Sequence, residues 1–127
     1  MKTNNRGQAI VEFALILPIL ALLVMGIIEF GLFFNSYINI TFASKEGARL
    51  ASLDANATTA SIEASIQATM PAMKNLAVTI TPPAPRTTGL PVAVAVSTQH
   101  TFSSPIISSL MPSNPYTISA STTARSE

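Results

Sequence analysis

The stretch that decides the fold lies at residues 9–34 and reads AIVEFALILPILALLVMGIIEFGLFF. Its only charged residues are Glu12 and Glu29, and residues 13–28 between them carry no charge. A helix of about 20 predominantly apolar residues is long enough to cross a bilayer. The stretch therefore predicts a membrane-spanning helix.

The composition around this stretch narrows the class of protein. Lys2 and Arg6 precede it, and such cations favour a cytoplasmic amino terminus, which leaves the rest of the chain outside the cytoplasm. Charged residues make up only 10%, against about a quarter in ordinary soluble domains. The net charge of +1 gives no electrostatic case for nucleic acid as a partner. Without cysteine, the chain has neither disulfides nor thiolate metal sites.

Three membrane interpretations compete for the amino-terminal segment. A secretory signal peptide has a short apolar core and a small-residue cleavage site, whereas this stretch is too long and no convincing Ala-x-Ala site follows it. An ordinary uncleaved signal anchor leaves Glu12 unexplained, because an ionisable group near the membrane is costly without a partner. The third interpretation, a processed anchor, accounts for that residue.

The residues around Glu12 resemble the processing site of type IV-type prepilins: Arg6-Gly7-Gln8-Ala9-Ile10-Val11-Glu12-Phe13. In that family a membrane prepilin peptidase cuts after a glycine on the cytoplasmic side, and a glutamate stands fifth in the mature chain. The resemblance implies a cut between Gly7 and Gln8, with Glu12 fifth and Phe13 sixth. Residues 1–7 would then be the leader. A glycine before the bond lets an extended backbone enter a protease cleft.

Cleavage would create an ammonium group at Gln8, close to the carboxylate of Glu12. Both charges would lie beside an apolar core, where an unpaired charge is disfavoured. We hypothesise that the two groups pair, within one subunit or between neighbours, and so set the axial register of a filament.

The whole opening, residues 6–31, is similar to the TadE-like family of the tight-adherence (Tad) pilus system. The matching residues are Arg6-Gly7, Ala9-Ile10-Val11-Glu12-Phe13-Ala14-Leu15, Pro18 and Glu29-Phe30-Gly31. Weaker similarities follow in residues 43–49 and 118–125. The resemblance implies a pilin or a minor pilin (pseudopilin). Its partners would be the membrane, a prepilin peptidase and other pilin subunits, in a homo- or hetero-polymer.

The resemblance also implies a location and a role. The subunit would lie in the cytoplasmic membrane before assembly, and in an extracellular pilus at the cell surface afterwards. TadE-like proteins are usually minor or initiating subunits, although the sequence does not encode copy number.

We expect specific roles for two residues inside the anchor. Pro18 removes a backbone donor and should kink the helix, which membrane helices tolerate. Glu29 has two interpretations: it marks the outer membrane interface, or it pairs with a cation of another subunit.

The helix is expected to continue beyond the membrane to Leu53, and to be about 68 Å long from Ala9 at 1.5 Å per residue. Four apolar residues recur every fourth position and therefore share one face, and the projecting half can pack on a small head: Phe30, Phe34, Ile38 and Phe42. Glu46 and Arg49 are spaced to form an ion pair. Residues 8–54 would be this helix, with the anchor at about 9–34.

Residues 55–127 predict a small α+β head. A second helix is expected to start at Thr58 or Thr59, with an apolar face that faces the core, and to bend or end at Pro71. Apolar residues then alternate with small or polar ones in three segments, which predicts about three antiparallel strands: 76–80, 92–102 and 116–121. The predicted fold class is thus α+β and pilin-like, with a long amino-terminal membrane-spanning helix, a second short helix and a small antiparallel sheet.

The proline-rich loop at residues 104–115 carries several apolar side chains. Two interpretations stay open: these side chains fold back over the edge of the sheet, or they contact the next subunit.

We find no candidate active site, cofactor, metal site or small-molecule substrate in the sequence. His100 is the only histidine and is expected at the surface of a strand, and no set of metal ligands clusters around it. The main alternative to a pilin is an uncleaved, signal-anchored surface protein that uses the small head for binding or adhesion.

Overall fold

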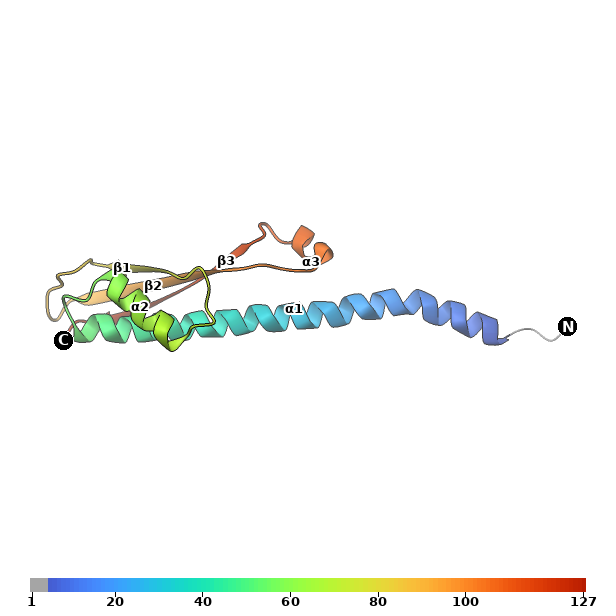
Figure 1. Cartoon of the computed structure of the whole chain (residues 1–127), viewed down its shortest axis with the longest axis horizontal. Helices are drawn as coiled ribbons and strands as arrows, with labels where there is room; N and C mark the ends of the chain where they lie inside the picture. Colours follow the sequence, from blue (N-terminus) through green and yellow to red (C-terminus); the bar gives the residue numbers. More distant parts are fainter. Residues whose placement is uncertain (1–4) are drawn as a thin grey trace.

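In the computed structural model, which describes residues 5–127, a long helix bears a small head on its carboxyl-terminal half (Figure 1). Lys2 and most of the predicted leader lie outside the described residues. The elements in chain order are α1 (Asn5–Leu53), α2 (Thr59–Thr69), β1 (Ala77–Thr81), β2 (Pro91–His100), α3 (Pro105–Leu110) and β3 (Tyr116–Arg125).

Helix α1 runs without interruption from the predicted anchor into the head, as the sequence predicted. Its 49 residues correspond to about 73 Å at 1.5 Å per residue. It is long and apolar enough to cross a membrane, with a mean hydropathy of 2.7 over an 18-residue window that is not buried by the rest of the chain. The helix ends at Leu53, and the next turn is closed by Asp54, whose carboxylate accepts a hydrogen bond from the backbone N–H of Asn56 at 2.9 Å.

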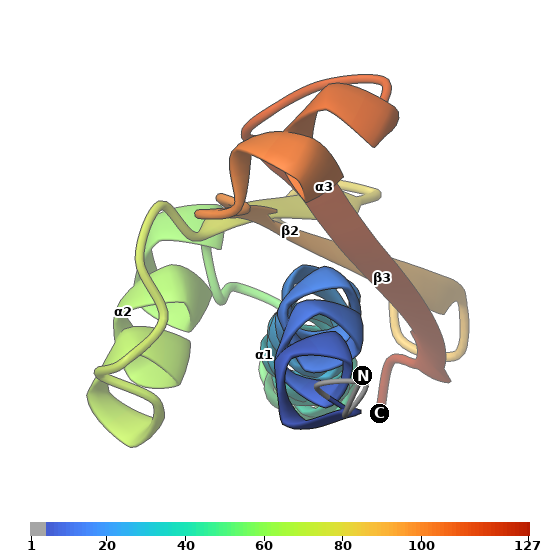
Figure 2. The same cartoon turned by 90° about the vertical axis from the view of Figure 1, so that its right-hand side faces the viewer.

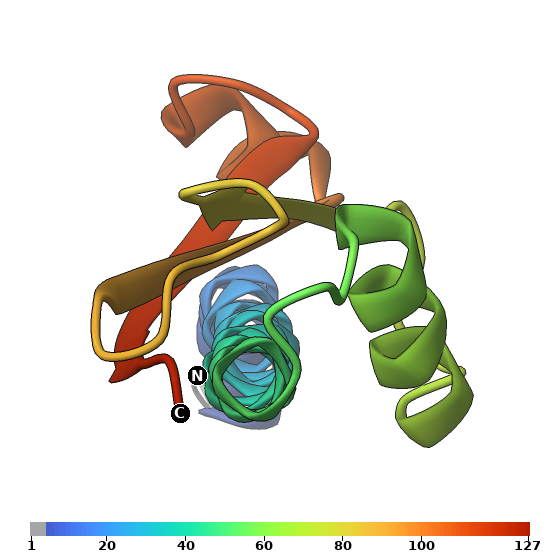
Figure 3. The same cartoon turned by 90° about the vertical axis from the view of Figure 1, so that its left-hand side faces the viewer.

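The three predicted strands form one antiparallel sheet in the order β1-β2-β3. Ile80 pairs with Val94, and Val96 pairs with Ala120. Figures 2 and 3 show the sheet lying over α1, with α2 beside α1 on the same side of the sheet. The alternating residues that face these helices form the core; on the strands they are Val78, Ile80, Val92, Val94, Val96 and Ile118. The predicted fold class is therefore confirmed.

The face of α1 that packs under the sheet is not its aromatic face. Small side chains are buried there at helical spacing: Ala43, Ser44, Gly47, Ala48 and Ala51. Small residues let the sheet approach the helix backbone closely, which bulky side chains would prevent. Phe30, Phe34, Ile38 and Phe42, which share another face, all remain exposed.

Helix α2 confirms its predicted start and end. The Thr58 side chain caps it, accepting a hydrogen bond from the backbone N–H of Ser61 at 3.2 Å, and the helix stops before Pro71. Ile62 and Ile66 face the core and are almost fully buried.

Arg86 ties the loop between β1 and β2 to the end of α1. Its guanidinium donates hydrogen bonds to the carbonyl oxygens of Asp54 and Ala57, and its backbone N–H donates to the carbonyl of Ala55 at 2.9 Å. A buried cation that meets several carbonyl oxygens after a helix terminus is favourably placed for the helix dipole. The sequence carries no signal for this role of Arg86, because its partners are backbone carbonyl groups.

The segment 104–115, expected to be a loop, contains the six-residue helix α3. Pro105 occupies its first turn, where the missing N–H of proline costs nothing. Ile107 is buried in the head, whereas Ile106 and Leu110 are exposed. The segment therefore folds back on the head through only some of its apolar side chains.

The predicted pair on the outer surface of α1 is present. Arg49 Nη2 lies 2.7 Å from Glu46 Oε1, and a second hydrogen bond joins the two side chains. These hydrogen bonds, together with the charge of Arg49, hold the pKa of the Glu46 carboxyl below its usual value. The pair is exposed, so it contributes little to stability.

Gly47 lies where α1, α2 and the sheet meet most closely. A Cβ atom at this position would stand 2.9 Å from Cγ1 of Val94 and 3.3 Å from Cδ1 of Ile66. Both neighbours are fully or almost fully buried, and the branched Val94 side chain has little freedom to move. We expect Gly47→Ala to destabilise the head by about 1–3 kcal/mol through overpacking, despite the better helix propensity of alanine.

The measurement is denaturant unfolding of the full chain in detergent micelles, followed by the fluorescence of its two tyrosines. Gly31→Ala is the matched control, because a Cβ at Gly31 has no neighbour within 4 Å. Equal stability of the two variants would contradict the close approach at Gly47.

Candidate functional site at the junction of anchor and head

The predicted cleavage site lies in the first turns of α1. Gly7 and Gln8 are helical and exposed, so the extended backbone that a protease requires is not the conformation of the uncleaved chain. Among the described residues, a Cβ atom at Gly7 would have no neighbour within 4 Å, so packing against residues 5–127 does not require glycine here. Cleavage between Gly7 and Gln8 stays a prediction, and it requires this first turn to unwind.

Glu12 lies one turn after Gln8 on the exposed surface of the helix. Its Oε1 accepts a hydrogen bond from Nε2 of Gln8 at 3.1 Å, and Phe13 beside it is also exposed. The helix therefore brings together the two residues whose charges are expected to pair after cleavage. Pairing of the Glu12 carboxylate with the ammonium of Gln8 stays a hypothesis.

Pro18 does not interrupt α1, and it is the proline inside this helix. Figure 1 shows that the blue, amino-terminal portion of the helix is bent relative to the rest. A proline within a helix removes one backbone hydrogen bond and its ring displaces the preceding turn, which is the usual cause of such a bend.

Glu29 joins the anchor to the head. Although it lies in the apolar stretch, it is only 6% exposed. Its Oε1 accepts hydrogen bonds from the backbone N–H groups of Ser103 and Ser104, both at 2.9 Å. These donors come directly before α3, at the end of the head nearest to the amino-terminal half of α1 (Figure 1). A carboxylate that accepts two N–H bonds is stabilised where an unpaired charge would not be.

Neither sequence interpretation of Glu29 included these partners. The donors belong to the same chain, more than 70 residues away, and the carboxylate is covered by the head. The other oxygen, Oε2, is buried and has no hydrogen-bond partner among the described residues. Pairing of Glu29 with a cation of another subunit stays a hypothesis.

Aromatic side chains fill the space next to this contact. The ring of Phe33 stacks on Phe102 with centroids 5.8 Å apart, and it meets His100 and Tyr116 edge-on. Nδ1 of His100 lies 3.3 Å from the Ser36 hydroxyl. His100 was expected at the surface; it is instead half-buried, because the β2 strand turns its ring toward α1.

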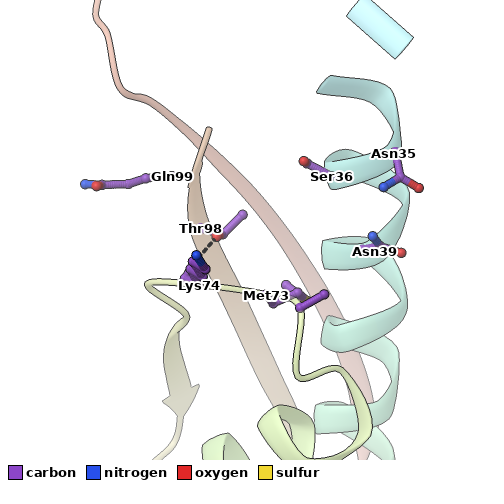
Figure 4. A pocket seen from close by; sticks show the side chains of 8 residues that line it. Asn35, Ser36, Asn39, Met73, Lys74, Thr98 and Gln99 are labelled. Atoms are coloured by element: carbon purple, nitrogen blue, oxygen red, sulfur yellow. Dashed lines mark hydrogen bonds between the residues drawn. The ribbon is translucent and has the colours of Figure 1, made fainter. Parts of the chain in front are cut away.

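The cavities of the head do not form a converging polar site. One, of about 280 Å³, lies between α1, β2 and the loop before β1. Figure 4 shows that Gln99 and Asn35 on its two sides point away from each other. A second, of about 290 Å³, lies between α1 and β3 and is lined mainly by aromatic rings. Within residues 5–127, no group of three or more acidic, histidine or cysteine side chains is arranged to hold a metal ion.

These features define a class: a pilin-like α+β protein, in which an apolar amino-terminal helix projects from a head with a three-stranded antiparallel sheet. The model of the TadE-like protein family matches residues 7–49, about a third of the chain. This match confirms the resemblance seen in the sequence and identifies nearly all of α1 as a TadE-like segment. The head lies outside the match, including the weaker similarity at residues 118–125. No curated protein and no solved structure matched the chain.

We predict that Glu29→Ala will loosen the segment around α3, because the N–H groups of Ser103 and Ser104 lose their acceptor. An unsatisfied buried donor costs about 1–3 kcal/mol, so hydrogen exchange at these two amides should accelerate by roughly 10- to 100-fold. Exchange measured by NMR or mass spectrometry on the full chain in micelles checks this.

Glu29→Gln is the matched control, because its amide oxygen can still accept both bonds while the charge is removed. We expect its exchange rates to stay close to those of the unchanged chain, and the amides of β1 to be unaffected in both variants. If the amides of Ser103 and Ser104 exchanged as slowly in Glu29→Ala as in the unchanged chain, their hydrogen bonds to Glu29 would not be what holds this segment.

Proposed function

We propose that this chain is a minor pilin, or pseudopilin, of a Tad-type pilus, anchored in the membrane and assembled through its amino-terminal helix. The single observation behind the proposal is that one continuous helix is TadE-like over residues 7–49, bare and apolar in its first half and covered by a head in its second. Its role is structural, and its partners are the membrane, a prepilin peptidase and other pilin subunits.

The proposal divides the chain into three parts. Residues 1–7 are the leader, residues 8–54 the helix, and residues 55–127 the head. The second and third parts are not independent in space, because the carboxyl-terminal half of α1 supplies one side of the core of the head. Cleavage would therefore shorten only the bare end of the helix and leave the head intact.

The exposed aromatic face of α1 supports assembly with other subunits. Phe34 and Phe42 are 59% and 56% exposed, and with Phe30 and Ile38 they extend the apolar surface of the anchor into the region beside the head. Aromatic side chains contribute large contact areas when they become buried between helices. Packing against helices of neighbouring subunits would cover this face once the subunit leaves the bilayer.

Processing gives the direct test. When the full chain is co-expressed with a prepilin peptidase, mass spectrometry of the membrane-extracted protein should find an amino terminus at Gln8. Gly7→Leu should block the cut, since a branched side chain replaces the hydrogen that the protease cleft accommodates.

Gly26→Ala is the control for the loss of a glycine in the same helix, because a Cβ there also has no neighbour within 4 Å. It should be processed at the normal rate. A protein that retained Met1 in the presence of an active peptidase would instead indicate an uncleaved, signal-anchored surface protein.

Glu12 provides a test of assembly that is separate from processing. We predict that Glu12→Ala and Glu12→Gln are both cleaved but incorporated poorly into filaments, because neither can pair with the ammonium of Gln8. Glutamine can still hydrogen-bond the Gln8 side chain, so equal defects would assign the effect to the charge. The readout is the amount of subunit in filaments sheared from cells; normal assembly of Glu12→Ala would contradict the register role.

A further inference from the structure

The segment between β2 and β3, residues 103–115, forms the end of the head nearest to the bare half of α1, and we call it the hairpin tip (Figure 1). Ile106 and Leu110 on this tip are 50% and 77% exposed. Leu110 is the most exposed large hydrophobic side chain of the described residues. Two large apolar side chains on a six-residue helix are a costly surface to leave in water.

The contact with Glu29 fixes the height of the tip along α1. Counted from Ala9, the first residue of the apolar stretch, a span of about 20 residues ends at Ile28; counted from Phe13, after the charge of Glu12, it ends at Leu32. Both counts put the outer boundary of the hydrocarbon layer within about one helical turn of Glu29. The hydrogen bonds from Ser103 and Ser104 therefore hold the tip at this boundary.

Several polar groups of the tip form hydrogen bonds within the tip or with the adjacent Phe102. The Ser108 hydroxyl donates to the carbonyl of Pro105 at 3.1 Å, and that of Ser109 donates to the carbonyl of Ile106 at 2.7 Å. The Asn114 side chain both donates to the carbonyl of Phe102 and accepts from its N–H, at 3.1 Å each. Three prolines have no N–H to satisfy: Pro105, Pro112 and Pro115.

The tip also lacks the charges that would keep it in water. No aspartate, glutamate, lysine or arginine occurs between Arg86 and Arg125. Tyr116, which follows the tip in the chain, and Tyr37 of α1 line the aromatic cavity between α1 and β3. Tyrosine is enriched at membrane–water interfaces, where its ring is apolar and its hydroxyl meets water.

We propose that the hairpin tip is a second membrane contact, inserting Ile106 and Leu110 into the interface of the same bilayer that α1 spans. The inference rests on the proposed function, because it requires α1 to be in the membrane. The proposal also explains how a carboxylate can lie at membrane depth: the tip supplies two backbone donors to Glu29 and separates its side chain from lipid. Before assembly, the subunit is thus held upright by a helix across the bilayer and a short helix on its surface.

The absence of cysteine makes a depth measurement simple. Single variants of the full chain, Leu110→Cys, Leu20→Cys and Thr87→Cys, are spin-labelled and reconstituted in phosphatidylcholine vesicles at high dilution. Leu20 reports the anchor, and Thr87 is an exposed residue in the loop between β1 and β2, at the opposite end of the head (Figure 1). Collision of each label with oxygen and with a water-soluble nickel chelate then reports its depth.

We expect the label at Leu110 to collide with the nickel chelate several-fold less than the label at Thr87, and more with oxygen. If Leu20 is protected while Leu110 is as accessible to nickel as Thr87, the tip proposal is overturned and the anchor stands. If Leu20 itself is accessible to nickel, the anchor fails, and the proposed function fails with it.

A contact with another subunit gives a different signature. Protection of Leu110 by protein should bring spin–spin broadening and should disappear as the vesicles are diluted with lipid, which would overturn the lipid assignment. Protection that is independent of dilution supports it. Adding Glu29→Ala to Leu110→Cys should restore access of nickel to the label, and Glu29→Gln should not; unchanged protection in Glu29→Ala would refute Glu29 as the residue that holds the tip in the interface.

Discussion

The hydrogen bonds from Ser103 and Ser104 to the carboxylate of Glu29 mark the point at which one helix changes its surroundings. Before this point α1 is bare and apolar; after it, one face is covered by the sheet while the opposite face stays exposed. Because α1 continues through both surroundings, the head needs a contact that fixes its position along the helix. A charged group with two backbone donors is suited to this, because both hydrogen bonds would break if the head moved along the helix.

The rest of the junction follows from side-chain size. Between Ala43 and Ala51 the buried face of α1 is made of alanine, serine and glycine, so the strands approach the helix backbone closely. Ser44 adds a polar contact there, since its hydroxyl lies 2.8 Å from that of Thr122 on β3. Larger side chains would have filled the same space but lifted the sheet away from the helix. Phe30, Phe34 and Phe42 lie instead on another face of α1, where they stay exposed in the described part of the chain.

Periodicity was enough to predict most of the fold. The apolar stretch and its continuation predicted helix α1, which ends at Leu53 as expected. The alternation of apolar with small or polar residues predicted the three strands, because one face of each strand is more buried than the other. Helix α3 was missed because the prolines of residues 104–115 suggested a loop, although Pro105 is also typical of a helix start. The partners of Glu29 could not be predicted from the sequence, because Ser103 and Ser104 donate through their backbone N–H groups, which any residue except proline carries. Arg86 was missed for a related reason: its acceptors are carbonyls of a turn some 30 residues earlier.

The two carboxylates of the anchor are now distinguished by their partners. They lie 17 residues apart, about 26 Å along a helix, which is close to the thickness of the hydrocarbon layer. Glu29 is covered by its own head, and its Oε1 accepts two backbone hydrogen bonds that partly compensate the desolvation of the carboxylate, while Oε2 has no partner among the described residues. Glu12 is exposed, and its hydrogen-bond partner among the described residues is the neutral amide of Gln8. Because a charge at a membrane boundary is stabilised most by an opposite charge, Glu12 is the carboxylate with more to gain from a partner outside the folded chain. The same residue type thus performs an intramolecular task at the outer end of the anchor and remains available for an intermolecular one at the inner end.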